Sequence, residues 1–399
     1  MNLFSNKENI IDYILILGLI AFSGFPFFYD IDNHLLYFLL FSFLVWINRK
    51  PEIKLKFVRF ILIFLLIFFF QTLVFNVFPI FSILGFFAKV FLAYFVIQSI
   101  SINSFLRIFI QIMLFFSTIS LIMFIPVLFN DSVINFYENF SFSYIRDIEV
   151  GSSRNTLFLL NLNFGDANNI ISRNSGPFWE PGAFGGFLII ALLMNKILYR
   201  KIFNFKGMIF ILAIISTFST TSYIALMVLI IIIKTSFSFK NISVGILLVF
   251  SFIYIFQQIP FLQDKINIQK NKTVSEDLNY SRKNRFGSFI VDMKDFIDYP
   301  ISGRGVNNLT RYNNAYDIEM NNRNNGITDF LVKFGIIGFL IYFIGVYQSF
   351  VKITNFYKQD KKISLLFFFT IFLIGFSEPY FAFPFFIALS LLRTSKFQL

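Results

Sequence analysis

The fold is decided by apolar runs such as residues 57–77, which read FVRFILIFLLIFFFQTLVFNV and carry a single charge, Arg59. About 20 mostly apolar residues form a helix long enough to cross the hydrocarbon core of a bilayer. Hydrophobic residues make up 57% of the 399-residue chain and charged residues only 14%, whereas soluble proteins carry roughly 25% charged residues. We therefore expect an all-α polytopic integral membrane protein with about 10–12 transmembrane helices.

The basic residues indicate how the chain is oriented. More than half of the 34 Lys and Arg residues fall in segments that are cytoplasmic if the N-terminus is inside, among them Arg49, Lys50 and Lys201. Because cytoplasmic loops of membrane proteins are enriched in Lys and Arg, the sequence predicts that both termini face the cytoplasm. The same rule accounts for the net charge of +12, so no nucleic-acid partner is expected.

This topology divides the chain into five regions. They are residues 1–129 (transmembrane helices 1–5), 130–180 (first long periplasmic loop), 181–259 (helices 6–9), 260–325 (second long periplasmic loop) and 326–399 (helices 10–12). Loops of this length usually carry function, and both fall on the outer side. We expect them to cover the outer face as short, partly amphipathic helices.

The chain has no cysteine and a single histidine, His34. Disulfides, thiolate nucleophiles and metal sites built from Cys or His clusters are therefore excluded. No acidic metal-binding motif stands out either, so we expect neither a metal nor a cofactor.

The first segment that could carry catalytic or binding residues is residues 173–186, RNSGPFWEPGAFGG. Pro181 suits the first turn of a helix, where its missing N–H costs nothing. Glu180 then takes the N-cap position, where the helix dipole favours its charge. We expect Arg173 to hold an anion and Glu180 to act as a base or as a ligand of a sugar hydroxyl. The alternative is a simple junction between a loop and a helix with a charged cap.

Two further segments lie in or near the outer loops. Residues 217–223, TFSTTSY, carry hydroxyls that could satisfy free backbone groups, face a polar cavity or form a simple turn. Residues 300–308, PISGRGVNN, follow Arg282, Lys283 and Arg285. Gly303 and Gly305 favour a tight turn that exposes backbone N–H groups and Arg304. Guanidinium groups bind phosphate oxygens in a bidentate manner, so this region suits a pyrophosphate; the alternative is a solvated basic loop.

The entry to the tenth span reads NNRNNGITDFLVKFGIIG over residues 321–338. Asp329 and Lys333 are four residues apart, in the order that favours an ion pair on one helical face. Charges inside a membrane are costly and indicate a functional site by default, although a purely structural ion pair is the alternative.

These segments, in this order, resemble the bacterial O-antigen polymerase and ligase superfamily, which includes the Wzy-type polymerases. The resemblance covers about residues 150–340. It rests on Arg173…Gly176…Phe178…Glu180-Pro181 and on Pro300…Gly303-Arg304-Gly305, followed by Asn325 and by Gly335 to Gly338. Residues 217–222 match the family's TxSR segment only in part, because no Arg follows. In the ligase branch a His precedes the Asn at the entry to the late span, whereas this chain has Asn324. That departure favours a polymerase.

The resemblance implies a glycosyltransferase that uses no nucleotide sugar. Its donor would be a growing glycan on undecaprenyl pyrophosphate, and its acceptor a sugar hydroxyl of another lipid-linked repeat unit. It would lie in the bacterial inner membrane with its active site facing the periplasm. Membrane lipid and a polysaccharide chain-length regulator would be further partners.

We expect three residues to be catalytic: Glu180, Arg173 and Arg304. Cations should stabilise the pyrophosphate leaving group, and the acceptor hydroxyl needs a base, for which Asp292 and Glu319 are alternatives to Glu180. Contacts to the substrate and its pyrophosphate are expected of Arg285, Arg282, Arg311, Arg323, Asn324 and Asn325.

Three other activities remain open from the sequence. A flippase for lipid-linked oligosaccharides would place charges along a central cavity and show two related halves, whereas here the charges gather in the outer loops. An O-antigen ligase lacks support because of the missing His. A transferase that uses a lipid-phosphate sugar would carry its acids in the first outer loop, which here is only residues 29–33, YDIDN.

Overall fold

The computed structural model describes residues 9–28, 32–130, 132–144, 154–157, 159–162, 173–234, 285–311 and 324–397. Most of the second long loop and the part of the middle bundle beyond residue 234 lie outside this range. So do Arg282, Glu319 and Arg323.

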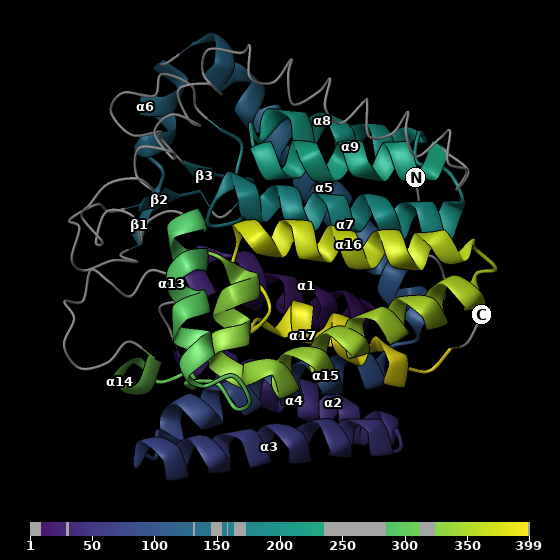
Figure 1. The fold of residues 1–399 in the computed structure, drawn as a ribbon. Helices are drawn as coiled ribbons and strands as arrows, with labels where there is room; N and C mark the ends of the chain where they lie inside the picture. Colours follow the sequence, from purple (N-terminus) through teal and green to yellow (C-terminus); the bar gives the residue numbers. More distant parts are fainter. Residues whose placement is uncertain are drawn as a thin grey trace.

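The N-terminal region consists of apolar helices (Figure 1). They are α1 (Ile10–Gly24), the 3-10 turn η1 (Pro26–Phe28), α2 (Asp32–Arg49), α3 (Leu55–Phe75), α4 (Ile80–Ser99) and α5 (Ile102–Phe129). Polar residues define where helices begin. Asn9 accepts a hydrogen bond from the N–H of Ile11 at 3.2 Å, and Ser101 accepts one from Ser104 at 3.2 Å, so each satisfies a backbone donor that the first helical turn leaves free.

The middle and C-terminal regions are also helical. Their elements are α7 (Pro181–Tyr199), α8 (Phe205–Ser216), α9 (Thr220–Lys234), α13 (Arg285–Asp298), α14 (Asn308–Arg311), α15 (Gly326–Phe356), α16 (Lys361–Ser377), α17 (Pro384–Leu391) and the 3-10 turn η3 (Leu392–Thr394). In the described ranges, five helices are long and apolar enough to cross a membrane: α3, α4, α5, α7 and α15. Shorter apolar helices include α1, α8 and α9. The chain is a multi-pass membrane protein, as expected.

The first long loop departs from the expected all-α fold. It holds the helix α6 (Ser132–Glu138) and a small antiparallel sheet of β1 (Phe142–Tyr144), β2 (Arg154–Thr156) and β3 (Asn161–Leu162). Two- and three-residue strands need no apolar face of their own, because pairing alone satisfies their backbone groups. The N–H of Asn161 donates to the carbonyl of Gly176 at 2.7 Å, which ties the sheet to the start of the 173–180 segment.

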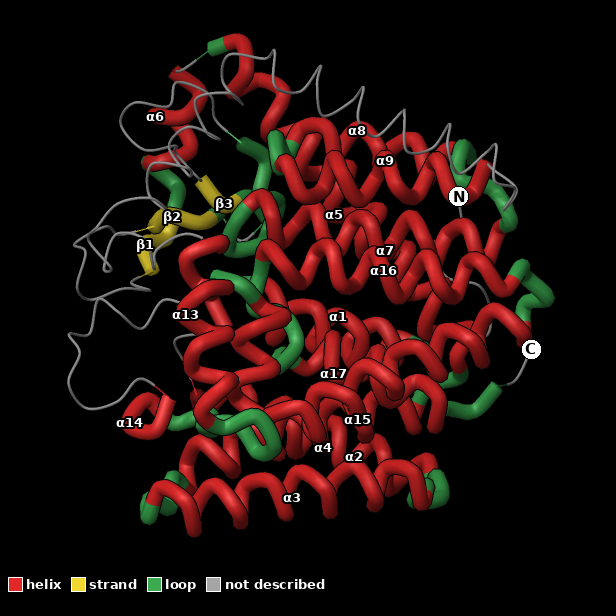
Figure 2. Tube along the Cα trace, in the orientation of Figure 1, coloured by secondary structure: helices red, strands yellow, loops and turns green. Residues whose placement is uncertain are grey.

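The helices pack side by side around the short helix α17, which contacts α1, α4 and α15. Phe385 of α17 lies between Phe109 of α5 and Phe187 of α7, with ring centroids 4.8 and 4.9 Å apart. Lipid tails are as apolar as phenylalanine, so close packing and hydrogen bonds hold such helices together. Figure 2 shows that α13, α14, α6 and the small sheet gather at one end of the bundle. The described parts of both long loops therefore lie at the same end of the bundle.

Candidate functional site

The segment 173–180 leads directly into α7. Pro181 is the first residue of the helix and Glu180 is its N-cap, as predicted. The Glu180 side chain makes no capping bond to its own helix. It faces Arg285 instead, whose Nη2 lies 3.4 Å from its Oε1. The charge at the end of α7 is thus directed toward another element.

Arg285 joins three helices at one point. It is the first residue of α13, its Nε donates to the carbonyl of Ser377 at the end of α16 at 2.7 Å, and its Nη2 donates to Oε1 of Glu378 at 2.9 Å. Burial alone would lower the pKa of Arg285, but the carboxylates of Glu378 and Glu180 outweigh it and raise that pKa. The guanidinium therefore stays positively charged beside two acidic groups.

Arg173 adds a second cation. Its Nε donates to the carbonyl of Thr217 at 3.3 Å, and within the described ranges its two terminal nitrogens make no hydrogen bond. Burial lowers its pKa, and Glu180, Arg285 and Glu378 are its principal electrostatic neighbours; an arginine nonetheless remains protonated. Arg173, Glu180, Arg285 and Glu378 are called the double Arg–Glu site below. Arg173 is the member with donors available to an anion.

Glu378 is the member that sequence reasoning missed, because it lies about 200 residues after Glu180 and outside the segments singled out above. Its side chain is only 4% exposed, against 32% for Glu180. The signal lies in a repeated dipeptide: Glu180-Pro181 opens α7, and Glu378-Pro379 follows α16. Gly182 leaves room for both acids, since an added Cβ there would lie 2.7 Å from Oε1 of Glu378 and 3.3 Å from Oε1 of Glu180.

The two acids are coupled. Burial raises the pKa of Glu378 well above its ordinary value, and the nearby carboxylate of Glu180, which shares a hydrogen bond with it, raises it further; Arg285 opposes both effects. Two carboxyl groups at this separation retain a proton more readily than an isolated one. One acid can therefore hold a proton while the other accepts one.

This coupling predicts how stability depends on pH. A carboxyl whose pKa is raised by folding binds its proton more tightly in the folded state, so the stability it contributes is lost as pH rises through the folded pKa. We expect the unfolding temperature of the purified protein to fall as the pH rises above the ordinary pKa of a glutamate, and Glu378→Gln to flatten that slope. Thermal unfolding in detergent at increasing pH measures it. Equal slopes for the variant and the wild type would contradict the raised pKa.

Arg304 and Arg311 lie in a second cluster, the α13–α15 ion network. Nη2 of Arg304 lies 2.6 Å from Asp298 and 3.7 Å from Asp295. Arg311 is 1% exposed and contacts Asp292 at 2.5 Å and Asp295 at 2.9 Å. The carboxylates of α13 thus occupy both guanidinium groups.

The same network reaches α15. Arg311 lies 3.5 Å from Asp329, and Asp329 pairs with Lys333 at 2.5 Å, which confirms the predicted ion pair. The hydroxyl of Thr328 donates to Asp292 at 2.7 Å. Opposite charges buried together in this way fix the position of α13 on α15.

The glycine turn at residues 303–305 forms as predicted, with positive φ at Gly303 (74°) and Gly305 (91°). The expectation that it exposes backbone N–H groups is wrong. The N–H of Arg304 donates to Val332 at 2.7 Å, and that of Gly305 donates to Lys333 at 3.0 Å. These carbonyls lack helical partners because α15 is interrupted at Gly335, whose φ is 62° and ψ −174°. The turn therefore completes a broken helix.

The two asparagines at the start of α15 have different positions. Asn325 is buried and is the N-cap, where its side chain accepts hydrogen bonds from Ile327 at 3.1 Å and Thr328 at 3.2 Å. Asn324 is exposed, and its N–H donates to the hydroxyl of Ser288 at 3.2 Å. The expected substrate contacts of Arg282 and Arg323 lie outside the described residues.

The hydroxyl-rich segment forms the turn between α8 and α9. The hydroxyl of Thr217 donates to the carbonyl of Ile214 at 2.7 Å and accepts from the N–H of Ser219 at 3.2 Å. These bonds satisfy the helix ends, as one of the sequence alternatives required. The turn also supplies the carbonyl of Thr217 that holds Arg173.

A comparison with protein families finds one described as O-antigen ligase, whose model matches residues 206–343. This range contains Arg285 and the α13–α15 ion network. A search of curated proteins finds no match. Members of this superfamily are membrane enzymes of the glycosyltransferase or ligase type. Over residues 206–343 the chain is therefore similar to members of the O-antigen polymerase/ligase superfamily.

Proposed function

We propose that the protein polymerises a surface polysaccharide by joining oligosaccharide repeat units linked to undecaprenyl pyrophosphate at the outer face of the bacterial inner membrane. The observation that carries the proposal is the double Arg–Glu site. It sets two cations beside two coupled acids at the end of the bundle where the described parts of both long loops lie. A reaction with an anionic leaving group and a hydroxyl nucleophile requires groups of these two kinds.

In the proposed reaction, a hydroxyl of the acceptor sugar attacks the anomeric carbon of the donor. A new C–O bond forms, the bond to the lipid pyrophosphate breaks, and the pyrophosphate leaves with the bonding electron pair. Arg173 and Arg285 stabilise the charge that develops on the pyrophosphate. The hydroxyl proton passes to Glu180, which is the more exposed of the two acids. Glu378 tunes Glu180 through the hydrogen bond between them.

Arg304 and Arg311 have a different part in this proposal. Their guanidinium groups already contact carboxylates of α13, so we assign them to positioning. They hold α13 on α15 and thereby keep Arg285 in the site. Arg282, Arg323 and Asn324 remain candidates for contacts with the pyrophosphate or with sugar.

A polymerase is favoured over a ligase by Asn324, which stands where the ligase branch has a His. The two activities leave different products when the gene is deleted. Loss of a polymerase leaves single repeat units on the lipid core, loss of a ligase leaves long chains on the carrier lipid, and loss of a flippase leaves no surface repeat.

The test is the surface glycan ladder of a deletion strain complemented with wild type, Arg173→Ala or Arg59→Ala. Arg59 is an exposed arginine on α3 and serves as the control. We expect wild type and Arg59→Ala to restore the ladder, and Arg173→Ala to leave single-repeat bands at an equal protein level. Long chains on the carrier lipid in the deletion strain would identify a ligase instead. An unchanged ladder in that strain would refute the proposal.

A further inference from the structure

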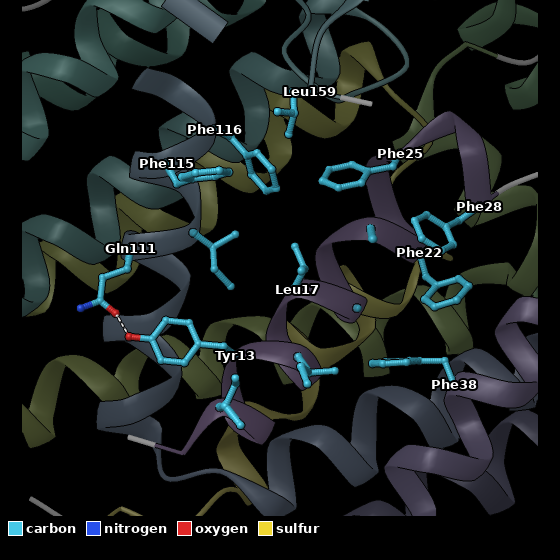
Figure 3. A pocket seen from close by; sticks show the side chains of 15 residues that line it. Tyr13, Leu17, Phe22, Phe25, Phe28, Phe38, Gln111, Phe115, Phe116 and Leu159 are labelled. Carbon is cyan, nitrogen blue, oxygen red and sulfur yellow. Dashed lines mark hydrogen bonds between the residues drawn. The ribbon is translucent and has the colours of Figure 1, made fainter. Parts of the chain in front are cut away.

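An apolar groove of about 670 Å³ lies between α1, α2 and α5 (Figure 3). Its walls are phenylalanine, leucine and isoleucine side chains, including Leu17 and Phe115. Among the residues that line it, only Tyr13 and Gln111 have polar side chains, and the hydroxyl of Tyr13 donates to Gln111. The lining is therefore almost entirely apolar, which does not suit a sugar or a nucleotide.

The shape of the groove suits a chain. Its lining runs along one side of α1 from Ile10 to Phe25, a length of roughly 22 Å at the helical rise per residue. One wall is α5, which is long and apolar enough to cross a membrane. A long apolar ligand that enters from the bilayer would fit these dimensions.

One end of the groove adjoins the double Arg–Glu site. The ring of Phe25 meets those of Phe116 and Phe178 edge to face, with centroids 5.2 and 5.4 Å apart. The N–H of Trp179 donates to the carbonyl of Gly24 at 3.1 Å. Phe178 and Trp179 immediately precede Glu180, so this end of the groove lies directly beside the segment that carries the acid.

Arg173 is linked to the same end. Its neighbour Asn174 donates through Nδ2 to the hydroxyl of Ser120 at 3.2 Å. Ser120 lies four residues, or about one helical turn, beyond the groove residue Phe116 on α5. Both ends of the 173–180 segment are therefore anchored at the head of the groove.

We propose that this groove holds the polyprenyl tail of the lipid-linked substrate while its pyrophosphate lies at Arg173. The assignment rests on the proposed function. It commits to the substrate tail because the groove continues into the site that would bind the pyrophosphate. A bulk phospholipid seated there would set its own phosphate against Arg173 and compete with the substrate.

The first test measures binding without turnover. A polyprenyl monophosphate with a photoreactive group near the end of its tail is added to the protein in vesicles of phosphatidylethanolamine and phosphatidylglycerol. We expect crosslinks to peptides of α1, α2 and α5, competed by unlabelled polyprenyl monophosphate. Crosslinks that extra phosphatidylglycerol displaces equally well would assign the groove to bulk lipid and overturn the proposal. Crosslinks confined to other helices would overturn it as well.

The second test fills the groove. Leu17→Trp and Ile14→Trp add bulk to partly exposed positions that line it, and Leu66→Trp on α3 adds the same bulk to an exposed position elsewhere. For a donor with a full-length tail, we expect either groove variant to raise KM about tenfold, which corresponds to about 1.4 kcal/mol. For a donor with a short, water-soluble tail, KM should not change. Leu66→Trp should alter neither value.

These results separate the two proposals. A wild-type protein that extends neither donor would refute the polymerase, while crosslinking would still test the groove. Equal effects of Leu17→Trp and Ile14→Trp on long-tailed and short-tailed donors would overturn the groove assignment and leave the polymerase intact.

Discussion

Replacing Arg285 with alanine should lower the rate of repeat-unit polymerisation by about 100–1,000-fold, the usual effect of removing one preorganised group that stabilises developing charge. The same change removes the hydrogen bond that Arg285 donates to Glu378 at 2.9 Å. Because burial and Glu180 already raise the pKa of Glu378, this acid takes up a proton when the cation is lost. We therefore expect a loss of stability of about 1–3 kcal/mol, the cost of a buried polar group left without its hydrogen bond. The rate is measured with purified protein and lipid-linked donor, and stability by thermal unfolding in detergent.

A paired variant separates the two effects. Arg285→Leu combined with Glu378→Gln removes both ionisable groups, so most of the lost stability should return while the polymerisation rate stays as low as in Arg285→Ala. Lys294→Ala changes an exposed cation on the same helix and should leave both measurements at wild-type values. Restored activity in the double variant would exclude Arg285 from the reaction.

Gly335→Ala should be the most destabilising of the glycine substitutions that we propose. The backbone of Gly335 adopts φ 62° and ψ −174°, a region that costs a non-glycine residue roughly 1–3 kcal/mol. An added Cβ would also lie 2.1 Å from the carbonyl oxygen of Ile301, so the loss should exceed that range. Unfolding followed by tryptophan fluorescence gives the change.

Gly85→Ala is the matched control, because an added Cβ at Gly85 meets no atom within 4 Å. It lies within α4, where alanine favours helix more than glycine does, so its unfolding temperature should stay the same or rise. If Gly335→Ala unfolds at the wild-type temperature, the turn at residues 303–305 does not depend on the interruption of α15.

Local patterns predicted several features correctly. Apolar runs gave the helices, the Glu180-Pro181 pair gave the start of α7, and the four-residue spacing of Asp329 and Lys333 gave their ion pair. Each of these depends on neighbours in sequence, whose geometry a helix fixes. Arg173, Glu180 and Arg285 were each proposed separately, and the structure brings them together.

Features that depend on distant contacts were harder to predict. Nothing near Glu378 indicates that it meets Glu180, because the two follow different helices that only the folded bundle brings side by side. One local pattern does hint at the ion pairs of Arg304. Asp292, Asp295 and Asp298 recur every third residue along one face of α13, and acids at this spacing can pair with basic residues. The exposure of a guanidinium depends on such partners, which residue type alone does not reveal.

The exchange of hydrogen bonds between residues 300–305 and the interrupted part of α15 has a consequence for chimeric proteins. A graft that moves only the outer loop from a relative would bring the N–H groups of the turn without the α15 carbonyls that accept their hydrogen bonds in that relative. Arg311, which pairs with Asp292 and Asp295 of α13, would likewise lose its contact with Asp329 of α15. The smallest transplantable block is therefore residues 285–356, from the first residue of α13 to the last of α15, and specificity swaps should move that block whole.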